Sequence, residues 1–209
     1  MPRLILCLAL SLLIAACASD SQPTGMALQV QQLRAKGDDA GAAEIYQRVL
    51  QQSPDDATAR IGLATIFEQH GDLTNAEKFY TEGLKIAPEK QDLLCGYGHM
   101  LLTAGRADNA RAQYQKAVEI DGDDVKALNG LGVSLDFLNQ HGAAQQNYSH
   151  ALGQDSNNLM TLNNMAHSYV LSGNYDKAIK LLEPRARDKA ATPALRQNLS
   201  EAYALAGMT

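Results

Sequence analysis

The sequence predicts an all-α protein, a solenoid in which pairs of helices repeat along the chain. One observation is a recurrence every 34 residues, without insertion or deletion, in which an alanine, a tyrosine and a glycine return in register. The other is helical periodicity, since apolar residues such as Leu63, Ala64 and Phe67 fall on one helix face. A fixed period of this length indicates stacked units that share a continuous core.

Each recurring position has a physical reason. The glycine, or an asparagine in its place, ends the first helix of a pair in the left-handed conformation that these residues adopt most easily. The alanine lies where two helices cross closely, and the tyrosine fills the space between neighbouring repeats. Pro54 and Pro88 stop second helices. The three columns are Gly37, Gly71, Gly105, Asn139, Gly173 and Gly207; Ala42, Ala76, Ala110, Ala144 and Ala178; and Tyr46, Tyr80, Tyr114, Tyr148 and Leu182.

This 34-residue pattern resembles the tetratricopeptide repeat, a helix-turn-helix unit. The resemblance implies a right-handed superhelical solenoid whose first helices line a concave groove for an extended peptide or a partner helix. We expect one repeat domain over 26–209. Its five repeats and C-terminal capping helix are predicted at 23–56, 57–90, 91–124, 125–158, 159–192 and 193–209.

The fifth repeat departs from the pattern at Pro184, which lies inside its second helix. Because proline interrupts a helix, we expect this helix to end near Leu182 and a loop to follow. Thr192 and Pro193 then match an N-cap and a first-position proline, and they predict the start of the capping helix.

The first 16 residues have the pattern of a signal peptide, with one basic residue before an apolar run too short to span a bilayer. Ile14 to Cys17 resembles the bacterial lipobox, which implies cleavage before Cys17 and acylation of that cysteine. Residues 17–25 would then be a tether, and Ala18 in place of aspartate implies the outer membrane, facing the periplasm. An ordinary cleaved signal and a short uncleaved anchor are the alternatives.

Charge and cysteine content exclude several classes. The net charge of −5 and the absence of a basic stripe argue against a nucleic-acid partner. Once the leader is removed and Cys17 is modified, Cys95 has no cysteine with which to form an intrachain disulfide. The acidic run 121–124 lacks the ligand spacing of a calcium loop and is expected to cap the helix that follows it.

No catalytic or metal constellation is predicted, and no cofactor. His70 and His150 are expected to be solvated, and His141 to lie in the turn of the fourth repeat. His99 and His167 occupy the same repeat position two repeats apart, roughly 20 Å from each other, which is too far to share a zinc ion. Cys95 and His99 could pair as nucleophile and base across one helical turn. The preferred interpretation is that both residues face the groove of a non-enzymatic protein.

The repeat register instead predicts a protein-binding groove. Its expected lining residues are Thr65, Glu68, Cys95, His99, Asn129, Asp136, Asn163, His167, Gln197 and Glu201. Asn164 and Asn198 either lie beside them or bond neighbouring helices. The groove lacks the lysines and arginines with which cytosolic chaperone adaptors hold a C-terminal carboxylate.

The C-terminal segment "ATPALRQNLSEAYALAG" is similar to that of the TadD family of tight-adherence (Flp) pilus proteins, as are the central repeats. The resemblance implies a lipoprotein that helps to assemble or stabilise the outer-membrane secretin through which pilin fibres leave. A type IV pilus pilotin and a periplasmic adaptor for peptidoglycan enzymes are the alternative functions.

Overall fold

A computed structural model describes residues 25–187 and 191–207, and within these ranges every regular element is an α-helix. The predicted signal peptide, Cys17 and the tether up to residue 24 lie outside the described residues. The helices are α1 (Gly25–Ala35), α2 (Asp39–Gln52), α3 (Ala57–Gln69), α4 (Leu73–Ile86), α5 (Gln91–Thr103), α6 (Ala107–Ile120), α7 (Val125–Phe137), α8 (His141–Gln154), α9 (Leu159–Leu171), α10 (Tyr175–Ala186) and α11 (Pro193–Leu205).

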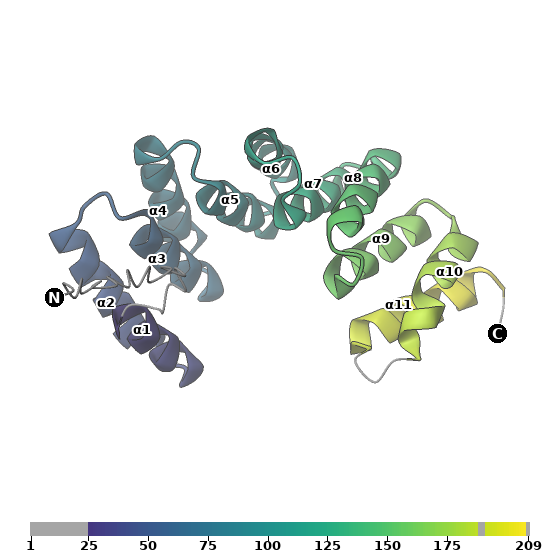
Figure 1. Cartoon of the computed structure of the whole chain (residues 1–209), viewed down its shortest axis with the longest axis horizontal. Helices are drawn as coiled ribbons and strands as arrows, with labels where there is room; N and C mark the ends of the chain where they lie inside the picture. Colours follow the sequence, from purple (N-terminus) through teal and green to yellow (C-terminus); the bar gives the residue numbers. More distant parts are fainter. Residues whose placement is uncertain (1–24, 188–190, 208–209) are drawn as a thin grey trace, which may run out of the picture.

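The helices stack in chain order into an arch, with α1 at one end and α11 near the other (Figure 1). Each helix packs against the next one along the chain, and from α3 onward each odd-numbered helix also contacts the next odd-numbered helix. The odd-numbered helices lie on the inside of the arch and the even-numbered helices on the outside (Figure 1). This arrangement is the superhelical solenoid that the repeat predicts.

The glycines and the asparagine that end the first helices have the left-handed conformation predicted for them. Asn139 has a φ of 58°, and the five glycines of the column have φ between 71° and 77°. Several first helices begin at side-chain caps: Asp124 accepts a hydrogen bond from the N–H of Ala127 at the start of α7, and Thr192 accepts one from the N–H of Leu195 at the start of α11. The acidic run 121–124 therefore caps a helix, and Thr192 and Pro193 start α11 as predicted.

The tyrosine column is held in the core by glycines on the first helices. The ring of Tyr114 lies between Gly98 of its own repeat and Gly130 of the next, where an added Cβ would come within 2.7 Å and 2.1 Å of ring carbons. Tyr148 packs on Gly132 in the same way and is 1% exposed. Because a methyl group would collide with each ring, Gly98 and Gly132 set how closely the two helices of a repeat approach, and Gly130 sets how closely the next repeat approaches.

The prediction that Pro184 ends its helix near Leu182 is wrong. Helix α10 includes Pro184 and continues to Ala186. The proline removes one N–H, whose helical acceptor would be the carbonyl of Lys180. Lys180 is exposed, so water can satisfy that carbonyl, and the helix continues for two more residues at the loss of one hydrogen bond.

Candidate protein-binding groove

The inner face of the arch contains two neighbouring hollows. The first has a cavity volume of about 470 Å³ and is lined mainly by α3, α5 and α7, with tyrosines of α4 and α6 behind them. The second has a volume of about 330 Å³ and lies between α7, α8 and α9. Both volumes lie in the lower part of the range found for sites that bind small ligands, so each hollow can hold a side chain.

Glu68 organises the first hollow. Its side chain is 9% exposed and accepts a hydrogen bond of 2.6 Å from Nδ1 of His99. Tyr80 and Thr103 place hydroxyl groups 3.4 Å from the same carboxylate. The hydrogen bond to Glu68 raises the pKa of His99, and burial raises the pKa of Tyr80 to about 12. The hollow therefore contains a carboxylate surrounded by donors.

The Cys95–His99 pair does not have the features of a catalytic dyad. Cys95 is 1% exposed, and burial raises the pKa of its thiol to about 11, so it stays protonated at neutral pH. His99 directs Nδ1 to Glu68 instead of to the sulfur. Cys95 contributes to the wall of the hollow, but its burial leaves little of it for a ligand to contact.

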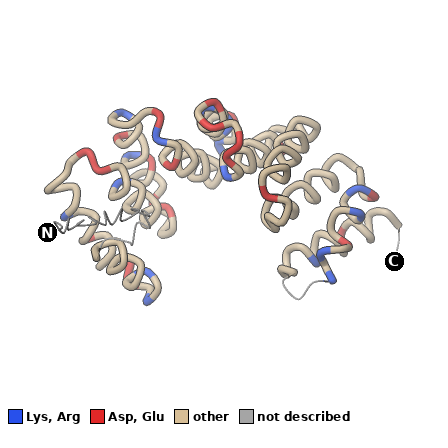
Figure 2. Tube along the Cα trace, in the orientation of Figure 1, with Lys and Arg blue, Asp and Glu red and all other residues tan. Residues whose placement is uncertain are grey.

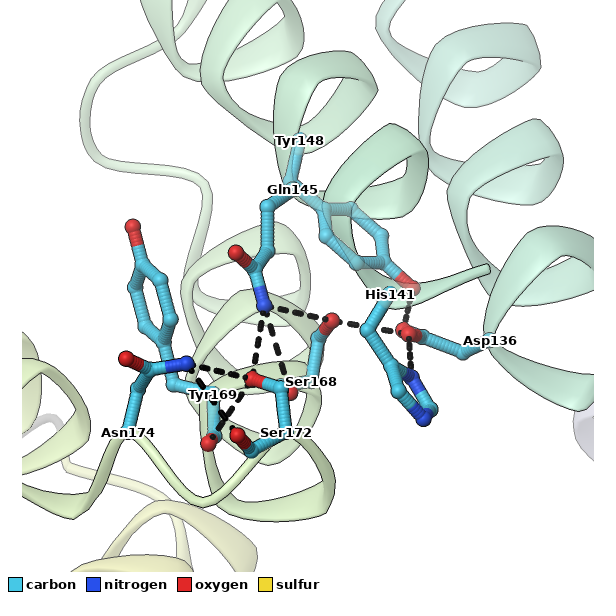
Figure 3. Close-up of polar contacts among 8 residues, drawn as sticks. All are labelled: Asp136, His141, Gln145, Tyr148, Ser168, Tyr169, Ser172 and Asn174. Atoms are coloured by element: carbon cyan, nitrogen blue, oxygen red, sulfur yellow. Dashed lines mark hydrogen bonds and ion pairs between the residues drawn. The ribbon is translucent and has the colours of Figure 1, made fainter. Parts of the chain in front are cut away.

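Asp136 organises the second hollow (Figure 3). Its Oδ1 accepts hydrogen bonds from Ser168 Oγ at 2.7 Å and from His141 Nδ1 at 2.8 Å, and its Oδ2 accepts one from Tyr148 at 2.9 Å. Burial, with the nearby Asp136 charge, raises the pKa of Tyr148 well above its ordinary value, so the hydroxyl remains a donor. Three donors thus satisfy a carboxylate that is 9% exposed.

His141 was expected in a turn, but it is the first residue of α8, and its side chain is 18% exposed. Because Asp136 can only accept, His141 donates from Nδ1, which in the neutral ring leaves Nε2 as an acceptor. Gln145 extends the network by donating to Ser172 at 3.0 Å (Figure 3). The cluster was not predicted from the sequence, because its members come from three helices.

The asparagines form a ladder between successive first helices. Asn164 donates to Asn129 at 3.0 Å, and Asn198 donates to Asn163 at 2.9 Å. Asn164 and Asn198 therefore both bond to a neighbouring helix, and Asn164 also lies in the groove. Asn129 lines the first hollow and Asn164 the second, so one amide–amide contact joins the two hollows.

The structure brings most of the predicted groove residues together in these hollows. The first contains Thr65, Glu68, Cys95, His99 and Asn129, and the second contains Asp136 and His167. Asn163, Gln197 and Glu201 line neither hollow, and Gln197 and Glu201 are exposed on α11. Among the described residues, no group of three or more histidine, cysteine or acidic side chains is arranged to hold a metal ion.

Two apolar residues of the second hollow were also missed. Phe137 and Leu171 end α7 and α9, and they are 64% and 48% exposed. They occupy the same position of successive repeats. Earlier repeats have polar residues at this position, namely Gln69 and Thr103. The change to an apolar residue is a sequence signal that could have identified Phe137 and Leu171.

Comparison with known families agrees with this architecture. Models of the tetratricopeptide repeat match residues 33–93, 91–124 and 161–193, and together these matches span more than half of the chain. The chain therefore belongs to the tetratricopeptide-repeat proteins. Arrays of this kind typically act as scaffolds that bind protein partners on their concave surfaces.

Several solved structures share the fold. PilW, described as a widely conserved type IV pilus biogenesis factor, aligns with a TM-score of 0.80 at 16% identity over 87% of this chain and 84% of its own. PilF of Pseudomonas aeruginosa aligns with a TM-score of 0.74 at 16% identity, over 87% and 82%. YrrB, described as having an unusual peptide-binding site, aligns with a TM-score of 0.63 at 18% identity, over 86% and 92%.

These identities establish a common fold and nothing finer. No curated protein matches the sequence. Within residues 25–187 and 191–207, no helix has the length and apolar character needed to cross a membrane.

Proposed function

We propose that this protein is a non-enzymatic lipoprotein of the bacterial outer membrane that binds a protein partner in its concave groove and assists assembly of a Flp or type IV-like pilus secretion apparatus. The observation on which the binding role depends is the pair of joined hollows on the inner face of the arch. They offer hydrogen-bonding groups and exposed apolar side chains within a preformed surface, which favours a peptide segment of another protein.

The membrane location depends on the lipobox resemblance of Ile14 to Cys17. An acylated Cys17 with two or more chains would hold the protein stably at a membrane, whereas a single chain binds marginally. The periplasmic arch would then be tethered next to proteins of the outer membrane.

The pilus role depends on the TadD resemblance of the C-terminal segment, and the fold shared with PilW is compatible with it. The partner that we propose is the secretin or another component of the pilus machinery. The protein would stabilise the secretin by holding a segment of it in the groove.

Deletion of the gene tests this proposal. We expect loss of heat-resistant secretin multimers on blots of membrane fractions, loss of surface pili, and restoration of both by the wild-type gene. Unchanged multimers with intact pili would refute the pilus role. Altered cell-wall composition with normal multimers would favour an adaptor for peptidoglycan enzymes.

The anchor has a separate test. A Cys17→Ser variant should be found in the soluble periplasmic fraction, with the same thermal unfolding as the wild-type protein. A Cys95→Ala variant is the matched control, and it should remain in the membrane fraction. A Cys17→Ser protein that still sediments with membranes would refute the lipid anchor.

A further inference from the structure

The two hollows are the same site, present twice at an offset of 68 residues, which is two repeats. Seven residues of the first hollow have a counterpart in the second at this offset. Three of these pairs keep their chemistry: an acid, a tyrosine that donates to it, and a histidine. They are Glu68, Tyr80 and His99 in the first hollow and Asp136, Tyr148 and His167 in the second.

Three other pairs change from polar to apolar, and this change separates the two hollows chemically. In each of these three pairs, the polar residue of the first hollow is replaced by an apolar residue in the second. The pairs are Thr65 and Val133, Gln69 and Phe137, and Thr103 and Leu171. The first is thus a hydrogen-bonding hollow, and the second is an apolar hollow on the same frame.

The apolar hollow suits a large uncharged side chain. Of the described residues that line it, Asp136 alone is charged, and three donors already satisfy its carboxylate. Helix α9, which forms one wall, has no charged residue (Figure 2). Exposed Phe137 and Leu171 therefore offer contact to an apolar group, and nothing at the site would compensate a buried charge.

The hydrogen-bonding hollow suits a side-chain amide. The hydroxyl hydrogen of Thr65 is used within its own helix, on the carbonyl of Ile61, so the Thr65 oxygen remains as an acceptor. An N–H donor of a side-chain amide can meet this acceptor. The hollow is lined by a cation, Lys126, and a carboxylate, Glu68, so a charge of either sign would meet a like charge there, whereas the oxygen of a neutral amide can accept from Lys126.

We infer that the groove binds an extended peptide that places a large apolar side chain in the apolar hollow and a glutamine or asparagine side chain in the hydrogen-bonding hollow. Two repeats correspond to roughly 20 Å, because packed helices lie 8–10 Å apart. An extended chain advances about 3.3 Å per residue, so the two side chains should be about six residues apart. The Asn129–Asn164 contact lies on the path between them. This inference refines the proposed function, since it specifies the segment that a partner would present.

Synthetic peptides test the spacing directly. The probes are fluorescein-labelled Gly-Ser peptides that contain one Phe and one Gln, six or three residues apart in either order, or only one of the two. Binding to the full-length protein in detergent is followed by fluorescence anisotropy. One of the two six-residue peptides should bind at least about tenfold more tightly than every other probe, because its second contact is intramolecular.

Variants connect each hollow to its side chain. Phe137→Ser should remove the contribution of the Phe and leave that of the Gln. A Gln69→Phe, Thr103→Leu variant should prefer a second Phe where the wild-type protein prefers Gln. Ile120→Ser is the matched control, since Ile120 is 46% exposed at the end of the outer helix α6, and this variant should bind like the wild-type protein.

Three results would overturn the inference: no binding by any probe, equal binding at both spacings, or unchanged preferences in the variants. Self-association that Phe137→Ser abolishes would also overturn it, by showing that the occupant is a second copy of the chain. If the peptides fail but gene deletion still removes secretin multimers, the spacing is wrong and the pilus role stands. If the peptides bind as expected and the multimers persist, the pilus role is wrong.

Discussion

A Gly130→Ala substitution tests the packing that sets the spacing of repeats. Gly130 lies inside α7, where alanine normally stabilises a helix by about 1 kcal/mol relative to glycine. An added Cβ, however, would lie 2.1 Å from a ring carbon of Tyr114, whereas carbon atoms in contact are about 3.5–4 Å apart. The ring must therefore retreat by more than about 1 Å.

Tyr114 has little room to retreat, because Gly98 packs on its other side and the residue is 4% exposed. Overpacking of this kind costs about 1–3 kcal/mol, or more where the backbone must shift. After subtraction of the helix-propensity gain, we expect Gly130→Ala to destabilise the protein by about 1–2 kcal/mol. The assay is urea unfolding followed by circular dichroism, with the midpoint compared at constant slope.

Gly153→Ala is the matched control. Gly153 lies in the last turn of α8, and an added Cβ there would meet no atom within 4 Å. It should stabilise the protein by up to about 1 kcal/mol, so the two substitutions should shift the midpoint in opposite directions. Tyr114→Leu should remove most of the cost of Gly130→Ala. A stabilising Gly130→Ala, or costs that simply add in the double variant, would refute the packing argument.

Three further substitutions test the turns and the two carboxylate clusters. Asn139→Gly should leave the urea midpoint nearly unchanged, whereas Asn139→Ala should destabilise the protein by about 1 kcal/mol. The reason is that residue 139 has a φ of 58°, which disfavours a Cβ unless the side chain compensates, as that of asparagine can. Equal effects of the two substitutions would contradict this prediction. Tyr148→Phe should lower the free energy of unfolding by about 2 kcal/mol in the same assay, since it leaves the buried Asp136 without its third donor. A neutral effect would show that this hydrogen bond adds no stability. Glu68 raises the pKa of His99, so the stability that this ion pair contributes is fully present below the unfolded pKa of about 6.5 and is lost as the pH rises through the folded pKa. The free energy of unfolding should therefore fall by less than about 1 kcal/mol between about pH 5.5 and 8, and His99→Gln should abolish this fall. An equal fall in the variant would show that another group causes it.

The helix pairs and their turns could be predicted because each depends on one local position. A left-handed turn residue, a close-packed alanine and a buried tyrosine return at a fixed period, and no long-range information is needed to place them. The extent of α10 was not predictable in this way. The effect of Pro184 depends on whether the freed carbonyl reaches water, and that depends on which side of the helix is exposed.

The groove was predicted as a face but not as a pair of hollows. Repeat register places Glu68 and Asp136 on the inner side, yet their partners depend on side-chain conformations across neighbouring helices. The bond from His99 to Glu68 joins α5 to α3, and the cluster around Asp136 joins α7, α8 and α9. The burial of Cys95 could not be predicted either, because the repeat register places it on the groove side of its helix although its side chain is buried.

Site-specific photo-crosslinking in living cells can show whether the groove holds a protein of the pilus machinery. A photo-reactive amino acid replaces Phe137 at the second hollow and, as control, Ile120 at the end of an outer helix. We expect a crosslinked product from position 137 that antibodies against the secretin, or against another pilus component, recognise, and no such product from position 120. No product from position 137, or the same product from both positions, would contradict this expectation.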